Sequence, residues 1–125
     1  MPAADVVRVL LVEDDDGLRN AYRLVLAARG FDVGMAATGE EALEQLEGPA
    51  GHPAAIVADL GLPGLSGPDL VTRLREEAPG SILLVLTGTR DDAVRRRCLS
   101  AGAARYLVKP VTGGELEATL RETCG

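Results

Sequence analysis

The sequence predicts one α/β domain in which a five-stranded parallel sheet is covered by helices on both faces. Short β-branched or leucine-rich runs alternate five times with segments of helical spacing, which is the pattern of repeated βα units. The runs are nearly continuous in apolar residues, as is usual for strands buried on both faces. The 125 residues, 46% of them hydrophobic and 26% charged, suffice for one core and are too few for two. We therefore expect a single doubly wound domain.

Five segments are predicted to be strands because each is rich in β-branched residues, leucine or alanine. They are residues 6–12, 31–36, 54–58, 82–87 and 103–108. The fourth is the clearest, since the run from Ile82 to Leu86 contains only aliphatic residues. The glycine- and proline-rich segment 48–53 is expected to be a loop within the domain rather than a linker between domains.

Helices are predicted between the strands from apolar spacing and from residues that favour helix starts. Capping boxes stand at Thr38-Gly-Glu-Glu41 and Thr112-Gly-Gly-Glu115, and Ser66-Gly-Pro-Asp69 is a close variant with proline in the first turn. Gly30 is expected to end the first helix. The predicted buried positions of the five helices are Leu18, Ala21, Tyr22, Val25 and Leu26; Ala42, Leu43 and Leu46; Leu70, Val71 and Leu74; Val94, Cys98 and Ala101; and Leu116 and Leu120.

Composition and charge argue against several classes of function. A formal net charge of −6 and a pI near 4.7 disfavour direct binding to nucleic acid or to an anionic membrane. No apolar run approaches a membrane span, and the amino terminus lacks the pattern of a signal peptide, so we expect a cytoplasmic protein. Cys98, Cys124 and His52 form no ligand pattern, so we expect neither a disulfide nor a zinc site.

Polar residues follow four of the predicted strands at the point where each strand ends. They are Glu13, Asp14 and Asp15 after the first strand, Asp59 after the third, Thr87 at the fourth, and Lys109 with Pro110 after the fifth. Because parallel strands end at one edge of the sheet, where open α/β sheets bind their ligands, we expect these side chains to converge.

Convergence of several carboxylates requires a positive charge, because like charges raise one another's pKa. A divalent cation meets this need, and Mg²⁺ suits an all-oxygen site that leaves a position for a phosphate oxygen. Lys109 is the only lysine in the chain and adds a compact positive charge beside the same pocket. The sequence therefore predicts a site for Mg²⁺ and a phosphoryl group.

Four segments at these strand ends resemble the motifs of one protein family. They are Val9-Leu-Leu-Val-Glu-Asp-Asp15, Asp59-Leu-Gly-Leu-Pro-Gly-Leu-Ser-Gly67, Leu86-Thr-Gly88 and Gly102-Ala-Ala-Arg-Tyr-Leu-Val-Lys-Pro110. In order and spacing they resemble the receiver domain of bacterial two-component response regulators, of the chemotaxis-regulator type. The resemblance implies that residues 1–125 form one receiver domain with a core at about 7–121. It also implies the flavodoxin-like strand order 2-1-3-4-5.

The resemblance implies a phosphoacceptor and a metal site. Asp59 matches the aspartate that receives the phosphoryl group. Asp14 matches the direct Mg²⁺ ligand and Glu13 its neighbour, which acts largely through metal-bound water. The backbone carbonyl of Gly61 matches a further ligand position, and Asp59 completes the set.

The resemblance also implies a phosphate-binding and switch apparatus. Thr87 matches the hydroxyl that hydrogen-bonds the phosphoryl group, and Tyr106 matches an aromatic switch residue. Lys109 matches the phosphate-binding lysine, which precedes a cis proline at Pro110. Gly61 carries no side chain where other members have residues that tune dephosphorylation, which leaves the lifetime of the phosphoryl group open.

The implied partners are proteins. The phosphodonor would be a sensor histidine kinase or a histidine phosphotransfer protein, and the recipient of the signal a downstream output domain or protein. A phosphorylation-dependent dimer stays open, although Ala104 and Arg105 stand where the subfamily with winged-helix outputs has acidic residues in its dimer face. The domain is expected to be a signalling module rather than an enzyme, with only self-phosphorylation and autodephosphorylation as catalytic acts.

Two other functions remain alternatives. A Mg²⁺-dependent phosphatase with an aspartyl nucleophile would use an Asp-x-Asp motif, but Gly61 stands at the second aspartate position. A receiver that binds partners without phosphorylation would be suggested by loss of an acidic ligand, Asp59 or Lys109, and all are present. No glycine-rich phosphate-binding motif supports a nucleotide site.

Two charged runs have simpler interpretations as well. Residues 13–16 would stabilise a helix amino terminus without any metal. Arg95 to Arg97 would form a solvated helix face, or together with Arg90 a basic patch for an acidic partner.

Overall fold

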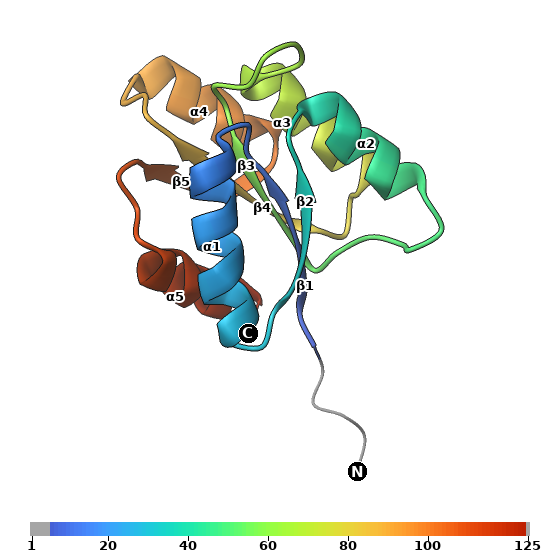
Figure 1. Ribbon diagram of the computed structural model, residues 1–125. Coiled ribbons are helices and arrows are strands. Elements are labelled where there is room, and N and C mark those ends of the chain that lie inside the picture. Colours follow the sequence, from blue (N-terminus) through green and yellow to red (C-terminus); the bar gives the residue numbers. More distant parts are fainter. Residues whose placement is uncertain (1–5, 125) are drawn as a thin grey trace.

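Five strands and five helices alternate along residues 6–124, the part of the chain that the computed structural model describes (Figure 1). The strands are β1 (Arg8–Val12), β2 (Asp32–Ala36), β3 (Ala55–Asp59), β4 (Ile82–Thr87) and β5 (Ala103–Val108). The helices are α1 (Asp16–Ala28), α2 (Gly39–Glu47), α3 (Gly67–Glu77), α4 (Asp92–Ala101) and α5 (Gly113–Cys124). All four strand pairs are parallel, in the order β2-β1-β3-β4-β5, which confirms the predicted fold.

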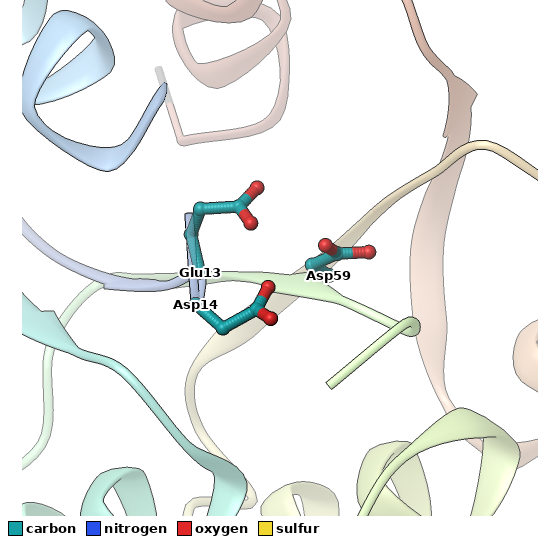
Figure 2. A group of neighbouring side chains, drawn as sticks. All are labelled: Glu13, Asp14 and Asp59. Carbon is teal, nitrogen blue, oxygen red and sulfur yellow. The ribbon is translucent and has the colours of Figure 1, made fainter. Parts of the chain in front are cut away.

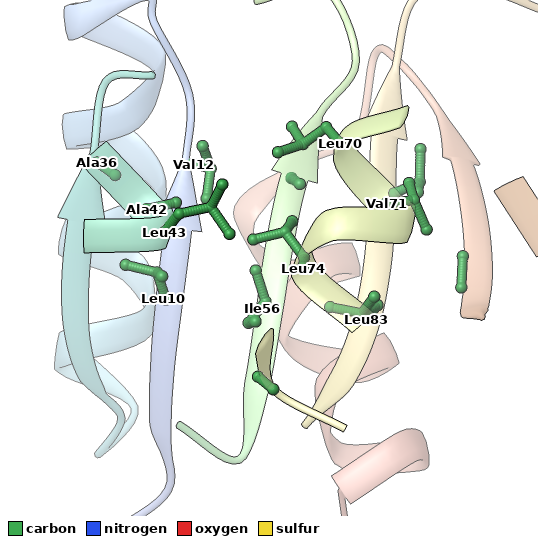
Figure 3. Close-up of a cluster of buried hydrophobic side chains, with 14 of the residues drawn as sticks. Leu10, Val12, Ala36, Ala42, Leu43, Ile56, Leu70, Val71, Leu74 and Leu83 are labelled. Atoms are coloured by element: carbon green, nitrogen blue, oxygen red, sulfur yellow. The ribbon is translucent and has the colours of Figure 1, made fainter. Parts of the chain in front are cut away.

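The helices form a layer on each face of the sheet. In Figure 1, α1 and α5 lie side by side on one face, while α2, α3 and α4 cover the other. The alternation of β1 shows the same division, because Val9 and Leu11 pack with α1 and α5, whereas Leu10 and Val12 pack with α2 and α3. Figure 3 shows the second of these cores, in which leucines of α3 lie against β3 and β4. No helix within residues 6–124 is long and apolar enough to cross a membrane.

The strand bounds differ from the predicted ones by at most two residues. β4 and β5 have the predicted limits, whereas β1 begins at Arg8 because its pairing with β2 begins there, opposite Asp32. Val6, which was included in the predicted first strand, is 57% exposed. β3 is shifted by one residue, so Asp59 is the last residue of the strand rather than the first after it.

Two of the three predicted helix starts have the expected side-chain caps. The Thr38 hydroxyl accepts a hydrogen bond from the Glu41 amide at 3.0 Å. At α5, Thr112 and Glu115 each accept a hydrogen bond from the other's amide, at 3.0 and 3.2 Å, which is the complete capping box. Ser66 stands at the start of α3 as predicted, but its side chain makes no capping hydrogen bond.

The predicted buried faces of the helices are largely correct. Cys98 is fully buried in α4, but Val94 and Ala101 are only half-buried, and Ala21 of α1 is exposed. Gly30 follows α1 with φ at 94°, the left-handed conformation that favours glycine after a helix. The spacing of apolar residues therefore found the correct face of each helix and overestimated its width.

The two outer strands of the sheet are β2 and β5. In β5, Ala103 lies opposite Leu83 and Arg105 opposite Leu84, so Ala104 is an extra residue that forms a bulge. In β2, the carbonyl of Met35 accepts a hydrogen bond from the Gln45 side-chain amide at 2.7 Å.

Candidate functional site

Three carboxylates meet at the edge of the sheet where the strands end. Glu13 and Asp14 directly follow β1, and Asp59 ends the neighbouring strand β3. Each offers a carboxylate oxygen that lies within 4.8 Å of the other two. Figure 2 shows the three side chains extending from the ends of β1 and β3 into the same space. The predicted convergence of these carboxylates is therefore present in the fold.

The three carboxylates differ in their surroundings. Glu13 is 2% exposed and Asp59 is 8% exposed, whereas Asp14 faces solvent. Glu13 Oε2 accepts a hydrogen bond from the Asp15 amide at 3.2 Å, and Asp59 Oδ1 accepts one from the Gly61 amide at 3.0 Å. Within residues 6–124 the Asp14 carboxylate has no hydrogen-bond partner, so it is the carboxylate with most freedom to bind a ligand from solvent.

Lys109 supplies the positive charge of the site. Its ammonium nitrogen lies 2.8 Å from Glu13 Oε1 and 3.1 Å from Asp59 Oδ2, and so joins the ends of β1, β3 and β5. Burial alone would lower the pKa of Lys109, but its hydrogen bonds and the negative charges of these two carboxylates hold that pKa above its usual value. The ammonium group therefore stays charged at neutral pH.

Glu13 is held in an unfavourable environment for its charge. Burial raises the pKa of the Glu13 carboxyl above its usual value, and the charge of Asp59 adds to this effect. The hydrogen bonds from Lys109 and from the Asp15 amide act in the opposite direction without cancelling it. The site thus favours an additional positive charge near Glu13 and Asp59.

The acidic run 13–16 divides into residues with separate contacts. Asp15 is the amino-terminal cap of α1, since its side chain accepts a hydrogen bond from the Leu18 amide at 2.8 Å. Asp16 forms an ion pair with Arg19 in the first turn. The capping interpretation therefore applies to Asp15, while Glu13 and Asp14 belong to the group of carboxylates around Asp59.

A cleft beside Asp59 contains further predicted residues. Asp59, Gly61, Thr87 and Lys109 all line it. Thr87 is 4% exposed, and its hydroxyl accepts a hydrogen bond from the Thr89 amide at 3.3 Å. The Lys109 amide donates to the Thr87 carbonyl at 2.7 Å, and the peptide bond that follows Lys109 is cis. The fold thus brings the predicted hydroxyl and ammonium groups to the same cleft as Asp59.

Tyr106 lies outside this cleft and is connected to it through Thr89. Its hydroxyl donates to the Thr89 carbonyl at 3.0 Å, and its ring packs against the core under α3 and α4. Thr87 and Tyr106 therefore share one neighbour, Thr89, at the start of the segment that leads to α4.

One contact near the site was not expected from the sequence. The hydroxyl of buried Tyr22, in α1, donates to the Val111 carbonyl at 2.7 Å and so holds the loop that follows Lys109. The sequence pattern places Tyr22 on the buried face of α1, but nothing in it indicates which carbonyl its hydroxyl reaches, because the two residues are far apart in the chain.

The donor set suits a hard divalent cation. All three acidic groups offer oxygen, and the Gly61 carbonyl lies in the loop beside Asp59. Mg²⁺ is bound by one or two carboxylates with several waters, which an open position such as that of Asp14 permits. The carboxylates of Glu13, Asp14 and Asp59 therefore fit a Mg²⁺ ion.

Comparison with known proteins agrees with the fold and the acidic cleft. The family model of the response regulator receiver domain matches residues 9–121. The chain is 41% identical over 113 residues to the transcriptional regulatory protein AfsQ1 of Streptomyces coelicolor, covering 90% of this chain and 49% of that protein. The chain spans about half or less of the length of the curated relatives that it matches.

Solved structures show the same likeness. A CheY-like receiver domain protein from Methanospirillum hungatei superimposes with a TM-score of 0.90 and 28% identity, covering 96% of this chain and 94% of that chain. A response regulator from Burkholderia pseudomallei, solved with a phosphorylated aspartic acid, a calcium ion and citrate, has a TM-score of 0.83 and 30% identity. That match covers 91% of this chain and 66% of the other.

The fold and its acidic cleft define a CheY-like signalling module of two-component systems. The chain belongs to the response regulator receiver domain family.

Proposed function

We propose that Asp59 is the phosphoacceptor of this receiver domain and that a histidine kinase or a histidine phosphotransfer protein is its donor. The observation that carries the proposal is the position of Asp59 in a cleft, where the Lys109 ammonium nitrogen lies 3.1 Å from Asp59 Oδ2. Asp14 belongs to the same cluster of three carboxylates. The Burkholderia regulator supports it, since that related protein carries a phosphorylated aspartic acid.

The chemistry needs groups that this chain holds. An oxygen of the Asp59 carboxylate attacks phosphorus as the bond between phosphorus and the donor histidine nitrogen breaks, and the leaving imidazole takes up a proton. Lys109 neutralises part of the charge on the transferred group, and the Thr87 hydroxyl donates a hydrogen bond to it. Asp14 and Asp59, together with Glu13 and the Gly61 carbonyl, would hold a Mg²⁺ ion, which would supply further positive charge beside the phosphoryl group.

The same proposal defines the domain's partners and its output. The domain accepts a phosphoryl group and loses it by hydrolysis, and it turns over no separate pool of substrate. A downstream output domain or protein then reads the changed surface. Gly61 places no side chain beside the Asp59 carboxylate, so water reaches the phosphoryl group without a barrier from that position.

The test is phosphorylation by a small phosphodonor in the presence of Mg²⁺, followed by intact-mass spectrometry. We expect one added phosphoryl group on the unaltered domain and none on Asp59→Asn. Asp69→Asn, which removes an exposed carboxylate from α3, is the matched control and retains labelling. Full labelling of Asp59→Asn, or labelling that persists in a chelator, would contradict the assignment.

A further inference from the structure

Helix α4 carries three consecutive arginines that have no partner within the described chain. Arg95, Arg96 and Arg97 are all exposed, and none forms an ion pair or a side-chain hydrogen bond with residues 6–124. Arg90, just before the helix, is exposed as well. In contrast, Arg75 of α3 donates to three backbone carbonyls, including that of Gly102 at 3.0 Å. The arginines of α4 are therefore not used to hold the fold together.

The segment of residues 90–105 has a net positive charge, whereas the rest of the chain has a net negative charge. Residues 90–105 hold five arginines and two aspartates, whereas the remainder of the chain holds eight basic and seventeen acidic residues. One of the two aspartates, Asp91, is occupied as the cap of α4, since it accepts hydrogen bonds from the Ala93 and Val94 amides. A net positive surface thus lies on a domain whose total charge is −6.

Two of the arginines line a groove between α3 and α4. The residues that line the groove are Ala93, Arg96, Arg97, Ser100 and Ala101 from α4, and Pro68, Asp69 and Thr72 from α3. Pro68 also lines the cleft that contains Asp59, so the groove adjoins that cleft. The groove combines small residues of α4 with two guanidinium groups, and it also includes the Asp69 carboxylate of α3.

We propose that this groove binds an acidic segment of a partner protein, whose carboxylates pair with Arg96 and Arg97. The planar guanidinium group donates two parallel hydrogen bonds to a carboxylate, which gives the pairing direction as well as strength. Arg95, also exposed on α4, adds a third positive charge to the same helix.

Charge favours a short acidic segment over the other anionic partners. A nucleic acid or a membrane presents negative charge over a wide area, which would also face the strongly acidic remainder of the domain. A second copy of this chain brings the same arginines, so a symmetric contact through α4 would place like charges together. A short acidic segment would contact Arg96 and Arg97 without spanning the acidic remainder of the domain, and the one acidic residue that lines the groove is Asp69.

The test uses a short synthetic peptide of repeated Glu-Glu-Leu units and the same peptide with glutamine for glutamate. We expect saturable one-to-one binding of the acidic peptide at physiological ionic strength, with NMR amide shifts concentrated in α4 and the facing side of α3. The glutamine peptide should not bind. The experiment needs no phosphorylation, so its outcome is independent of the function proposed for Asp59.

Charge reversal at the groove provides the decisive comparison. Arg96→Glu with Arg97→Glu should weaken binding about tenfold or more, since two attractive pairs become repulsive. Arg73→Glu with Arg105→Glu changes the net charge equally at exposed positions outside the groove and should leave the affinity within about twofold. Phosphodonor labelling of both double variants verifies that each is folded.

Three results would overturn the proposal. Equal loss of peptide binding in both double variants would mean that only total charge matters. Tighter binding of a DNA duplex or of anionic vesicles than of the peptide would assign the groove to an extended polyanion. Concentration-dependent self-association that only the Arg96 and Arg97 reversal removes would assign the groove to a second copy of the chain.

Discussion

At the scale of single residues, Lys109 explains how two carboxylates remain buried side by side. Its ammonium group bridges Glu13 and Asp59, which come from different strands. A buried carboxylate without a partner is strongly destabilising, and two that face one another are more so. The lysine therefore has a structural role in the metal-free domain in addition to its proposed contact with the phosphoryl group.

This role predicts a pH-dependent loss of stability in Lys109→Met. We expect the free energy of unfolding to fall by about 2 kcal/mol at pH 7, less than for a fully buried pair because the lysine side chain is 23% exposed. A carboxyl whose pKa is higher in the folded chain than in the unfolded chain stabilises the fold below its usual pKa. That stability is lost as the pH rises through the raised value. The deficit of the variant should therefore shrink toward pH 5, as Glu13 takes up a proton.

Urea denaturation at pH 7 and at pH 5 measures this effect. The control combines Lys109→Met with Glu13→Gln, which removes the uncompensated carboxylate and should recover most of the loss at pH 7. A deficit of equal size at both pH values would show that the lysine acts through packing of its aliphatic chain instead.

Replacement of Asp14 should stabilise the metal-free domain, in contrast to replacement of Lys109. Asp14→Asn removes one of three neighbouring negative charges without removing a hydrogen bond that holds the fold. We expect the metal-free variant to be more stable by about 0.5 kcal/mol and to bind Mg²⁺ at least about tenfold more weakly. Thermal melts with and without Mg²⁺ measure both quantities. A less stable metal-free variant would identify the acidic cluster as a structural network.

At the scale of secondary-structure elements, similar sequence patterns begin helices by different means. Thr38 caps α2 with its hydroxyl, whereas Ser66 occupies the same position in α3 without a side-chain hydrogen bond. Pro68 in the first turn of α3 has no amide to be capped and restricts the backbone to a helical conformation. The proline thus supports a start that the serine side chain does not.

This difference predicts unequal costs for the same kind of substitution. Thr38→Ala should lower the free energy of unfolding by about 1 kcal/mol, the usual value of a side-chain cap. Ser66→Ala should lower it by less than about 0.5 kcal/mol, because no capping bond is lost. Urea denaturation of the two variants is the measurement, and equal losses would contradict the assignment of the caps.

The elements also show which parts of the structure a sequence can predict. Local patterns found the strands β4 and β5, the helix starts and the meeting of Asp14 with Asp59, because strand direction alone determines which ends share an edge. They did not find the hydrogen bond from Tyr22 to Val111 or the bulge in β5. Both depend on how distant segments pack, and neither has a signature within a few residues.

At the scale of the whole molecule, a chain of hydrogen bonds connects the cleft with the surface near α4. The Thr89 amide donates to the Thr87 hydroxyl, and the Tyr106 hydroxyl donates to the Thr89 carbonyl. A phosphoryl group that accepts a hydrogen bond from Thr87 would reorient that hydroxyl and disturb this connection. The negative charge added at Asp59 would thereby favour one of two arrangements of the surface near α4.

This connection predicts how far the effect of phosphorylation extends. With a stable phosphoryl mimic on Asp59, we expect NMR amide shifts to spread through residues 90–117. In Thr87→Ala the mimic should still bind, but the shifts should stay near the cleft, because the first hydrogen bond of the chain is missing. Shifts confined to the cleft in the unaltered domain would instead mean that partners read the cleft directly.

The bulge at Ala104 lies on an outer strand, and this position bears on aggregation. The outer strand of a sheet offers unpaired backbone groups to other extended chains, which is how sheets grow into fibrils. The bulge interrupts the regular spacing of those groups in β5, and the exposed Arg105 adds a charge that opposes stacking. At the opposite edge, Gln45 occupies the Met35 carbonyl. These features oppose the addition of another extended chain at either edge of the sheet.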